Sequence, residues 1–419
     1  MPLSLWRHLD FQKLWAGQTI SEIGSRITRE GIPITAFVAL HATPMQMGIL
    51  VSLNGVSALL AGAMAGRAAD RRRRRPIMII ADVGRALVLL SVPVAAAYGT
   101  LQMWQLYAVV FVSGVLTIFF DVAYQSYLPS LVPHQQLLEG NSKLALSAAA
   151  AEVLGPAMTG FLIQVLTAPR AILLDSLSFL VSAVSIGSIR SKEAVPVAHE
   201  QNAGDPGFMV ALRYIMRDGV LRALLLRALT FALFIGFFST LYVPYAFGEL
   251  HLSAAAFGII VAMGGVGNLM GASVSEHLSK RIPVGMILIG CSLLSGVMTL
   301  LIPLAHGPVW IAALYLGTAQ LFGDISYPVY QVHELTLRQR LAPPEMLGRV
   351  NACLHLAFKG FWPMGALLGG FLASTIGTRP TLVICALGAM LSTAWLIASP
   401  IAALRNFPGG HVHSKSAGV

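Results

Sequence analysis

Charged residues are scarce in this sequence. Only 11% of its 419 residues are Asp, Glu, Lys or Arg, whereas 56% are apolar. A soluble globular domain carries about a quarter charged residues. The composition therefore excludes a soluble enzyme or binding domain and predicts a membrane protein with many spans, in agreement with a mean hydropathy of +0.73.

Motifs for metal, nucleotide and covalent chemistry are also missing. The three cysteines, Cys291, Cys353 and Cys385, lie in or beside apolar runs without a pairing pattern, so we expect buried, reduced thiols. No Cys/His cluster has metal-ligand spacing, no P-loop is present, and no nucleophile–His–acid set stands out. We expect no enzymatic activity, no metal and no cofactor. Residues 1–14 contain no short apolar region with a small-residue cleavage site, so we expect no cleaved signal peptide.

Long apolar runs dominate what is present. About 20 apolar residues span the hydrocarbon core, and runs of that length must be helices because lipid cannot satisfy the backbone of an open strand. Twelve segments qualify: 12–40, 45–66, 76–98, 103–127, 144–167, 170–189, 220–247, 253–275, 283–305, 309–331, 350–375 and 379–400. The predicted fold is an all-α membrane protein with twelve transmembrane helices in two pseudo-symmetric six-helix bundles.

The few charges are distributed unevenly. The net charge is +10, but the lysines and arginines fall in loops on one side of the expected spans, whereas the loops on the other side hold only Arg170 and Arg379. The positive-inside rule explains this asymmetry without nucleic acid as a partner, and it places both termini in the cytoplasm.

The chain divides into two similar halves. We expect an N-terminal bundle (1–189), a polar cytoplasmic linker (190–219), a C-terminal bundle (220–400) and a cytoplasmic tail (401–419). The repeat aligns Leu154–Leu162 with Met364–Leu372. It also pairs Asn141 with Asn351, Gly62 and Gly66 with Gly267 and Gly271, and Asp121 with Asp324. Parallel repeats of this kind place a substrate path between the halves, near the midplane.

A basic loop follows the second expected span. It runs from Gly66 to Arg75 and includes Asp70, Arg71 and Arg74. One interpretation is an orientation signal that only fixes topology. The other is a mechanical part, in which Gly66 lets two helix ends approach and Asp70 offers a carboxylate at the membrane edge.

These features resemble the major facilitator superfamily of transporters. Gly66-xxx-Asp70-Arg71-x-x-Arg74-Arg75 resembles the loop 2–3 motif of that family, with Arg73 at the expected second glycine, and Gly155-Pro156-xx-Thr159-Gly160 resembles the fifth-span motif of its proton antiporters. The arginine motif of many drug antiporters is missing from span 4. Further similarity, such as Phe11-x-x-Leu14-Trp15-x-Gly17-Gln18, is to the group that includes the enterobactin exporter and macrolide efflux proteins.

The resemblance implies outward export of a small molecule, driven by proton entry. It also implies that Asp70 faces the cytoplasmic start of span 11, near residues 348–351. There Asp70 would meet the partial positive charge of a helix N-terminus and latch the halves together. Gly66, Asp70, Arg71, Arg74, Arg75, Gly155 and Pro156 are thus candidates for conformational gating, and so are Asp121 and Asp324.

Span 1 contains an unusual polar stripe. Gln18, Glu22, Arg26 and Arg29 follow one another at helical spacing, so they share one face. Charges inside a span are costly unless they are paired or face water. Glu22 is placed to pair with Arg26, and the stripe is either a structural ion pair or a polar track that lines a cavity.

Three further side chains are candidates for the substrate and proton path. Glu152 lies one turn before Gly155 and is either a proton carrier or a packing partner. His355 and Lys359 share a face of span 11, where Lys359 can neutralise a carboxylate and His355 either packs or relays protons.

The sequence therefore predicts a proton-coupled exporter of small amphipathic molecules, such as drugs or antibiotics, that works by alternating access. We expect a multi-pass monomer in a bacterial inner membrane, with the proton gradient as its energy source. The alternatives are a siderophore exporter of the same fold, or a membrane sensor or assembly partner that does not transport.

Overall fold

The computed structural model is a bundle of long helices, and it describes residues 5–191, 193 and 207–407. The first six long helices are α1 (Leu9–Ile34), α2 (Pro44–Arg71), α3 (Arg74–Ala97), α4 (Met103–Leu131), α5 (Leu137–Leu166) and α6 (Ala168–Gly187). The second six are α8 (Gly219–Pro244), α9 (Ala254–Ser279), α10 (Val284–Leu304), α11 (Val309–Leu341), α12 (Pro344–Ile376) and α13 (Thr378–Leu391). Short helices α7 (Gly207–Arg217) and α14 (Ala394–Ile397) complete the order.

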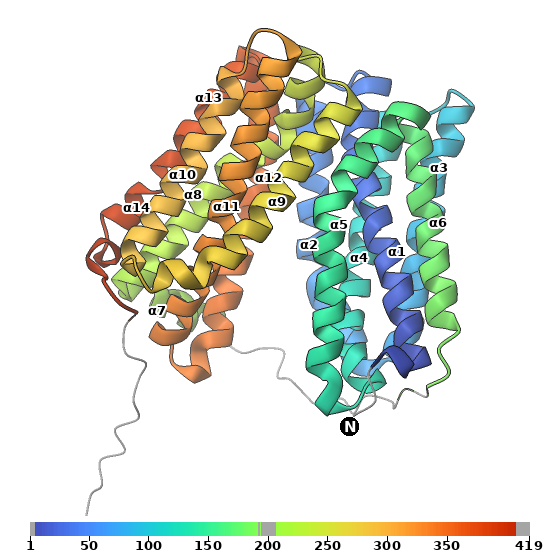
Figure 1. The fold of residues 1–419 in the computed structure, drawn as a ribbon, viewed down its shortest axis with the longest axis horizontal. Coiled ribbons are helices and arrows are strands. Elements are labelled where there is room, and N and C mark those ends of the chain that lie inside the picture. The colour runs from blue at the N-terminus through green and yellow to red at the C-terminus, as the bar shows by residue number, and fades with distance from the viewer. Residues whose placement is uncertain (1–4, 192, 194–206, 408–419) are drawn as a thin grey trace, which may run out of the picture.

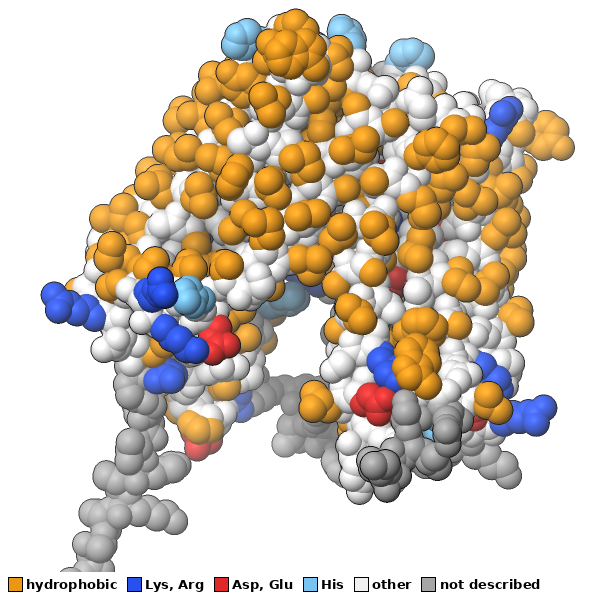
Figure 2. Space-filling model, viewed as in Figure 1, with side chains coloured by type: hydrophobic (Ala, Val, Ile, Leu, Met, Phe, Trp, Pro, Cys, Tyr) orange, Lys and Arg blue, Asp and Glu red, His pale blue; other side chains and the backbone are white. Residues whose placement is uncertain are grey.

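Helices α1–α6 form one bundle and α8–α13 the other (Figure 1). Among the described residues, ten helices are long and apolar enough to cross a membrane. Helices α1 and α11 complete the twelve, but they carry charged residues such as Arg26 and Glu334 within their length. Figure 2 shows apolar side chains spread over the middle of the visible face of both bundles, as lipid contact requires.

The repeat is visible in the helix boundaries. Helices α1 and α8 begin at Leu9 and Gly219, α2 and α9 at Pro44 and Ala254, and α3 and α10 at Arg74 and Val284, so each pair is 210 positions apart. The same spacing relates two π-helical turns, Thr35–Ala39 and Tyr245–Glu249. It also relates His41 and His251, which both have φ of 51°. The two halves are therefore copies of one six-helix unit.

Local capping fixes equivalent helix starts. The Thr43 hydroxyl accepts a hydrogen bond from the Gln46 amide at 3.3 Å, and the Gln46 side chain accepts one from the Thr43 amide at 2.8 Å. In the second half, Ser253 caps α9 by accepting from the Ala256 amide at 3.2 Å. Such caps satisfy amides that the first helical turn leaves unpaired.

The constant register corrects two of the predicted equivalences. With 210 positions between copies, Gly66 corresponds to Glu276 and Asp70 to Lys280, so Gly267 and Gly271 do not repeat the glycines of the basic loop. Helices α4 and α11 end at Leu131 and Leu341, which are also 210 positions apart. The residue of the second half that corresponds to Asp121 is therefore Gln331 and not Asp324. Asp324 lies near the middle of α11.

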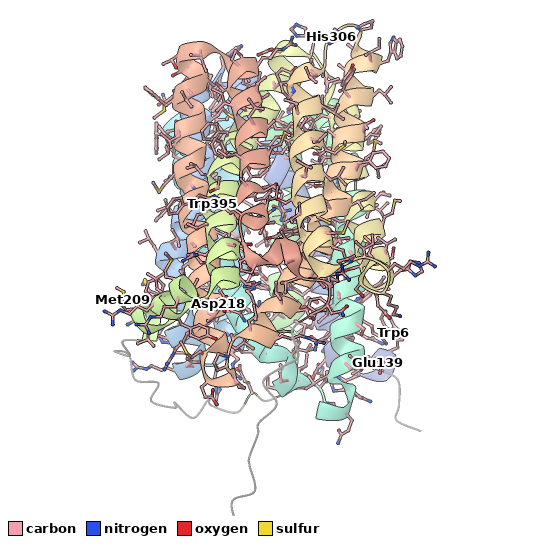
Figure 3. All side chains as sticks on the ribbon, turned by 90° about the vertical axis from the view of Figure 1, so that its left-hand side faces the viewer. Trp6, Glu139, Met209, Asp218, His306 and Trp395 are labelled. Atoms are coloured by element: carbon pink, nitrogen blue, oxygen red, sulfur yellow. The ribbon has the colours of Figure 1, made fainter. Side chains whose placement is uncertain are left out.

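The loop between α2 and α3 defines one end of the molecule, which we call the basic end. Helices α4, α5, α11 and α12 extend beyond the predicted apolar runs at this end. Figure 3 shows Glu139 and Asp218 toward this end and His306 at the opposite end. Most of the expected linker, and the tail from residue 408, lie outside the described residues.

Candidate functional site

The two halves touch through glycines on two helix pairs, α2 with α12 and α5 with α9. A Cβ added at Gly160 would lie 2.9 Å from the Cα of Gly258, and one added at Gly370 would lie 2.6 Å from the Pro44 carbonyl, beside Gly48. Real Cβ atoms do not approach that closely, so only glycine permits these backbones to meet. Glycines thus bring two equivalent helix pairs into direct contact.

The halves separate toward the basic end. A Cβ added at Gly62, Gly66 or Gly348 would meet no atom within 4 Å, although all three lie on α2 or α12. Figure 2 shows the resulting hollow between the halves. The chain therefore adopts a state that is joined at the far end and open at the basic end.

Two cavities follow this opening into the molecule. One of about 650 Å³ lies against α1, α2, α3 and α4, where Arg29, Glu30 and Arg85 contribute charged side chains. The other, of about 940 Å³, is lined largely by α8, α11 and α12. Both are lined by Asn54, Ala58, Ile118 and Trp362, so these side chains mark the boundary where the two spaces meet.

The ion pair of span 1 differs from the prediction. Arg26 pairs with Glu152 of α5, with 2.5 Å between Nη2 and Oε2, and not with Glu22. Gly155 makes room for this pair, because a Cβ there would lie 2.9 Å from the Cβ of Arg26. The prediction failed because helical spacing reveals neighbours on one helix but not a partner on another.

The Arg26–Glu152 pair lies beside the contact between the halves. The Glu152 carbonyl would be 2.7 Å from a Cβ added at Gly265 of α9, and Gly258 packs against the Pro156 carbonyl. Gly155 and Pro156, predicted gating residues, therefore lie between this ion pair and the opposite half.

Residues of the polar stripe on α1 line two different cavities. Gln18 and Glu22 line a pocket of about 370 Å³ between α1, α4 and α5, and the Gln18 amide donates to Ser182 at 3.3 Å. Arg29 lines the larger 650 Å³ cavity instead. The stripe is thus not the single continuous track that its spacing suggested.

A buried charged pair on α3 was missed from the sequence. Asp82 and Arg85 form an ion pair, and neither residue is more than 5% exposed. The Arg85 guanidinium also lies over the rings of Phe179, at 4.0 Å, and Phe120, at 4.5 Å. The signal was present, since two charges three residues apart interrupt an apolar run.

The second half holds its own missed cluster. The Arg227 guanidinium lies 3.9 Å from the Tyr330 ring and 4.3 Å from the Phe231 ring, and Nε donates to Ser292 at 3.4 Å. On α11, Glu334 forms an ion pair with Arg338, with 3.6 Å between Oε1 and Nε. Charge within the apolar run of α8 was again the available signal.

The remaining predicted path residues lie on the second half. His355 and Lys359 line the 940 Å³ cavity on α12. Of the predicted gating residues, Asp121 is exposed on α4 of the first half, and Asp324 is half-buried on α11, with its carboxylate against Gly264. The glycines of α9 therefore pack against both α5 and α11.

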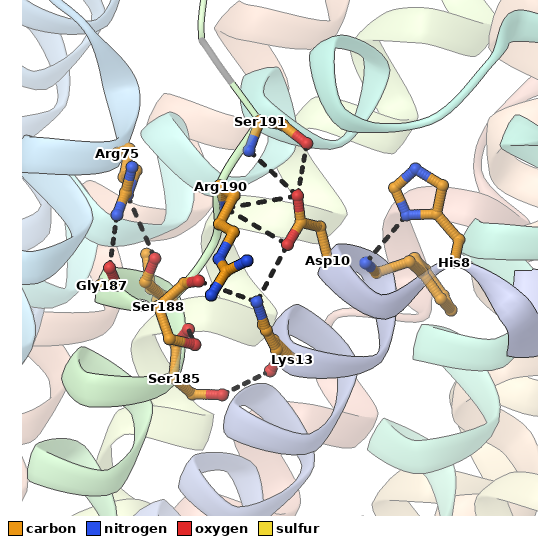
Figure 4. A network of polar contacts seen from close by, with 11 residues as sticks. His8, Asp10, Lys13, Arg75, Ser185, Gly187, Ser188, Arg190 and Ser191 are labelled. Atoms are coloured by element: carbon orange, nitrogen blue, oxygen red, sulfur yellow. Dashed lines mark hydrogen bonds and ion pairs between the residues drawn. The ribbon is translucent and has the colours of Figure 1, made fainter.

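The arginines of the basic loop hold the first half together in this state. The Arg74 and Arg75 amides donate to Glu193 at 2.7 and 3.1 Å, and the Arg75 side chain donates to the Ile186 carbonyl at 3.1 Å. Arg75 also donates to the Gly187 carbonyl (Figure 4). Asp70 and Arg71 are exposed, and a Cβ added at Gly66, one turn before Asp70, or at Gly348, at the start of α12, would meet no atom within 4 Å.

Asp10 is the centre of a hydrogen-bond network in the same bundle (Figure 4). It accepts from the Ser191 hydroxyl at 2.6 Å, the Arg190 amide at 3.2 Å and Lys13 at 3.1 Å. Burial opposes its ionisation, but these hydrogen bonds prevail and hold the pKa of Asp10 well below its usual range. This network ties the start of α1 to the end of α6.

Residues 14–359 match the family model described as "Major Facilitator Superfamily". The chain belongs to this superfamily of membrane transporters. The match confirms the resemblance in the sequence and agrees with the two-bundle fold. Among the described residues, no group of three or more His, Cys, Asp or Glu side chains is arranged to hold a metal ion.

Three similar proteins illustrate the range of the family. Macrolide efflux protein A of Streptococcus pyogenes is 25% identical over 399 residues, which cover 91% of this chain and 94% of that protein. The enterobactin exporter EntS of Citrobacter koseri is 24% identical over 393 residues, covering 89% and 86%. The crystal structure of a bacterial homologue of the iron transporter ferroportin, in an inward-facing state, has a TM-score of 0.71 at 18% identity, covering 94% and 99%.

Proposed function

We propose that this major facilitator protein is a proton-coupled exporter of small amphipathic molecules that works by alternating access. The observation that carries the proposal is the charged cavity between the halves, open at the basic end and closed beyond the glycine contacts. Charges at this depth are costly unless they serve a water-filled path or a ligand. A sensor or assembly partner would gain little from keeping them.

Two substrate classes follow from the similar proteins. Macrolide efflux favours an antibiotic or drug, whereas the enterobactin exporter favours a siderophore. We place export of drug-like amphipathic compounds first and siderophore export second. The proton gradient supplies the energy, and no other cofactor is needed.

We further propose that the basic end faces the cytoplasm of a bacterial cell, with the protein as a monomer in the inner membrane. The Arg71–Arg75 run at this end supports that orientation through the positive-inside rule. The open state would then accept substrate from the cytoplasm.

The Arg26–Glu152 pair is the proposed site of coupling. A proton that enters from outside neutralises the Glu152 carboxylate and releases Arg26, and its later release to the cytoplasm restores the pair. Because the pair adjoins the α5–α9 contact, its state can bias how the halves pack. Glu22 is the second candidate proton carrier.

The test is uptake into inside-out vesicles under an imposed pH gradient, acidic inside, with a macrolide and a catecholate siderophore measured in parallel. Glu152→Gln is expected to lower gradient-driven uptake about tenfold, the size of an effect of about 1.4 kcal/mol. The gradient-driven uptake of Glu22→Gln is measured alongside, because Glu22 is the second candidate proton carrier. The matched control is Glu276→Gln, because Glu276 is exposed and, among the described residues, its ion-pair partner is the exposed Lys280 at 2.7 Å.

Uptake of neither compound by wild-type vesicles would support the sensor alternative. Coupled exchange that is unchanged by both Glu152→Gln and Glu22→Gln would remove both carboxylates from the proton path.

Asp70→Asn is expected to slow transport about fivefold while leaving insertion intact. The proposed latch to the start of α12 uses a carboxylate at a helix N-terminus, which is worth about 1 kcal/mol when partly exposed. Uptake per inserted molecule measures the effect, with Asp70→Glu as the charge-preserving control. Normal transport by a well-inserted Asp70→Asn protein would show that Asp70 is not a latch and would support the interpretation of the loop as an orientation signal.

A further inference from the structure

The cavity against the second half has an excess of positive charge. Its lining includes three fixed cations, Arg227, Arg338 and Lys359, together with His355. Glu334 is the one carboxylate among the described lining residues. Glu334 pairs with Arg338 at 3.6 Å, so it already has a partner.

Lys359 differs from the other two cations. Arg227 is held between aromatic rings and donates to Ser292. Lys359 is half-buried, and it has no ion pair or hydrogen bond within the described part of the chain. An ammonium group at this depth is costly unless it has a counter-charge or faces water, and here it faces the cavity.

Aromatic side chains line the same cavity as Lys359. Phe231, Tyr327, Phe358 and Trp362 contribute to the lining, and Trp362 is fixed by donation from its indole to Ser239 at 3.2 Å. A volume of about 940 Å³ is large enough for a ligand of drug size. The wall thus offers flat apolar surface beside an unpaired cation.

A candidate counter-charge for Lys359 comes from the other half. Asp121 on α4 is exposed and lies within electrostatic range of Lys359. Arg85 and Glu22 also act on Asp121, and no salt bridge joins Asp121 to Lys359 among the described residues. Lys359 is therefore available in the open state, and Asp121 is a carboxylate that can compete for it electrostatically.

We propose that Lys359 anchors an anion subsite that binds the carboxylate, sulfonate or phenolate group of an aromatic amphiphile. This inference rests on the proposed export function and specifies its substrate class. The aromatic wall takes the ring system of the ligand, and Asp121 competes with the ligand anion for Lys359. Loss of Asp121 charge should therefore strengthen binding, while loss of Lys359 charge weakens it.

Two matched fluorescent probes test the subsite on the full chain in nanodiscs of phosphatidylcholine. 8-Anilinonaphthalene-1-sulfonate is anionic, and N-phenyl-1-naphthylamine has the same aromatic system without the sulfonate. Lys359→Gln is expected to weaken binding of the sulfonate about tenfold, the loss of a charge-assisted contact. Binding of the neutral probe should change less than about twofold, since its apolar contacts remain.

Two further variants keep the test decisive if Lys359→Gln folds poorly. Lys359→Arg should retain sulfonate binding, and Asp121→Asn should tighten it about threefold, as expected for removal of a competing charge at partial exposure. Lys280→Gln is the control, because Lys280 is exposed directly after the end of α9 and does not line the cavity.

Equal weakening of both probes by Lys359→Gln would overturn the proposal, because it would show a packing role. Unchanged sulfonate binding in Lys359→Gln, or weaker binding in Asp121→Asn, would also overturn it. If vesicles transport nothing while the probe pattern holds, the export function fails and the subsite stands.

Discussion

Gly160→Val is expected to reduce transport by about 10- to 100-fold. The Cβ would meet the backbone of Gly258 and the Ala254 carbonyl, so α5 and α9 would be forced apart. Overpacking a tight contact costs about 1–3 kcal/mol, and here the cost falls on the state that is closed at the far end. Vesicle uptake, normalised to inserted protein, measures the loss.

Gly290→Val is the matched control for this variant. Gly290 is exposed on α10, and a Cβ there would meet no atom within 4 Å. We expect it to transport normally. Full activity of a well-inserted Gly160→Val protein would show that the α5–α9 contact is not needed in the transport cycle.

Arg85→Leu is expected to lower the free energy of unfolding by about 3–5 kcal/mol, because it leaves the buried Asp82 carboxylate without its partner. Thermal unfolding in detergent should show a fall in melting temperature of roughly 5–10 °C. The same change also removes the stacking of the guanidinium on Phe120 and Phe179.

The double variant Asp82→Asn with Arg85→Leu separates charge from packing. It removes both charges, so we expect it to recover at least half of the lost stability. A double variant that is less stable than Arg85→Leu alone would show that the guanidinium stabilises α3 chiefly through its contacts with the aromatic rings.

Much of the fold could be predicted from the sequence because lipid restricts the chain to long apolar helices. The twelve segments and the repeat around Gly155 and Gly365 suffice for the two-bundle architecture. The register of the repeat could not be derived from glycine spacing. The spacing of Gly267 and Gly271 resembles that of Gly62 and Gly66. However, Gly267 and Gly271 pack against Leu321 and Ile325 of α11, whereas a Cβ added at Gly62 or Gly66 would meet no atom within 4 Å.

The candidate site was only partly predictable. Depth in an apolar span singles out charged side chains, and the same rule applied to α3 would have found Asp82 and Arg85. Which charges meet is a tertiary property. Arg26 reaches Glu152 because α1 packs on α5 at Gly155, and no spacing on α1 encodes that contact.

Exchange between an open and a closed basic end is the central claim, and double electron–electron resonance tests it most directly. One label pair is Arg72→Cys with Glu345→Cys, at the basic ends of α2 and α12. The other is Thr100→Cys with His306→Cys, in exposed loops at the opposite end. Both pairs are built without Cys291, Cys353 and Cys385. We predict two populations whose balance shifts with pH and substrate, with the basic-end distance shortening as the opposite-end distance lengthens. A single distance at each end, unchanged by pH and by every tested compound, would contradict alternating access.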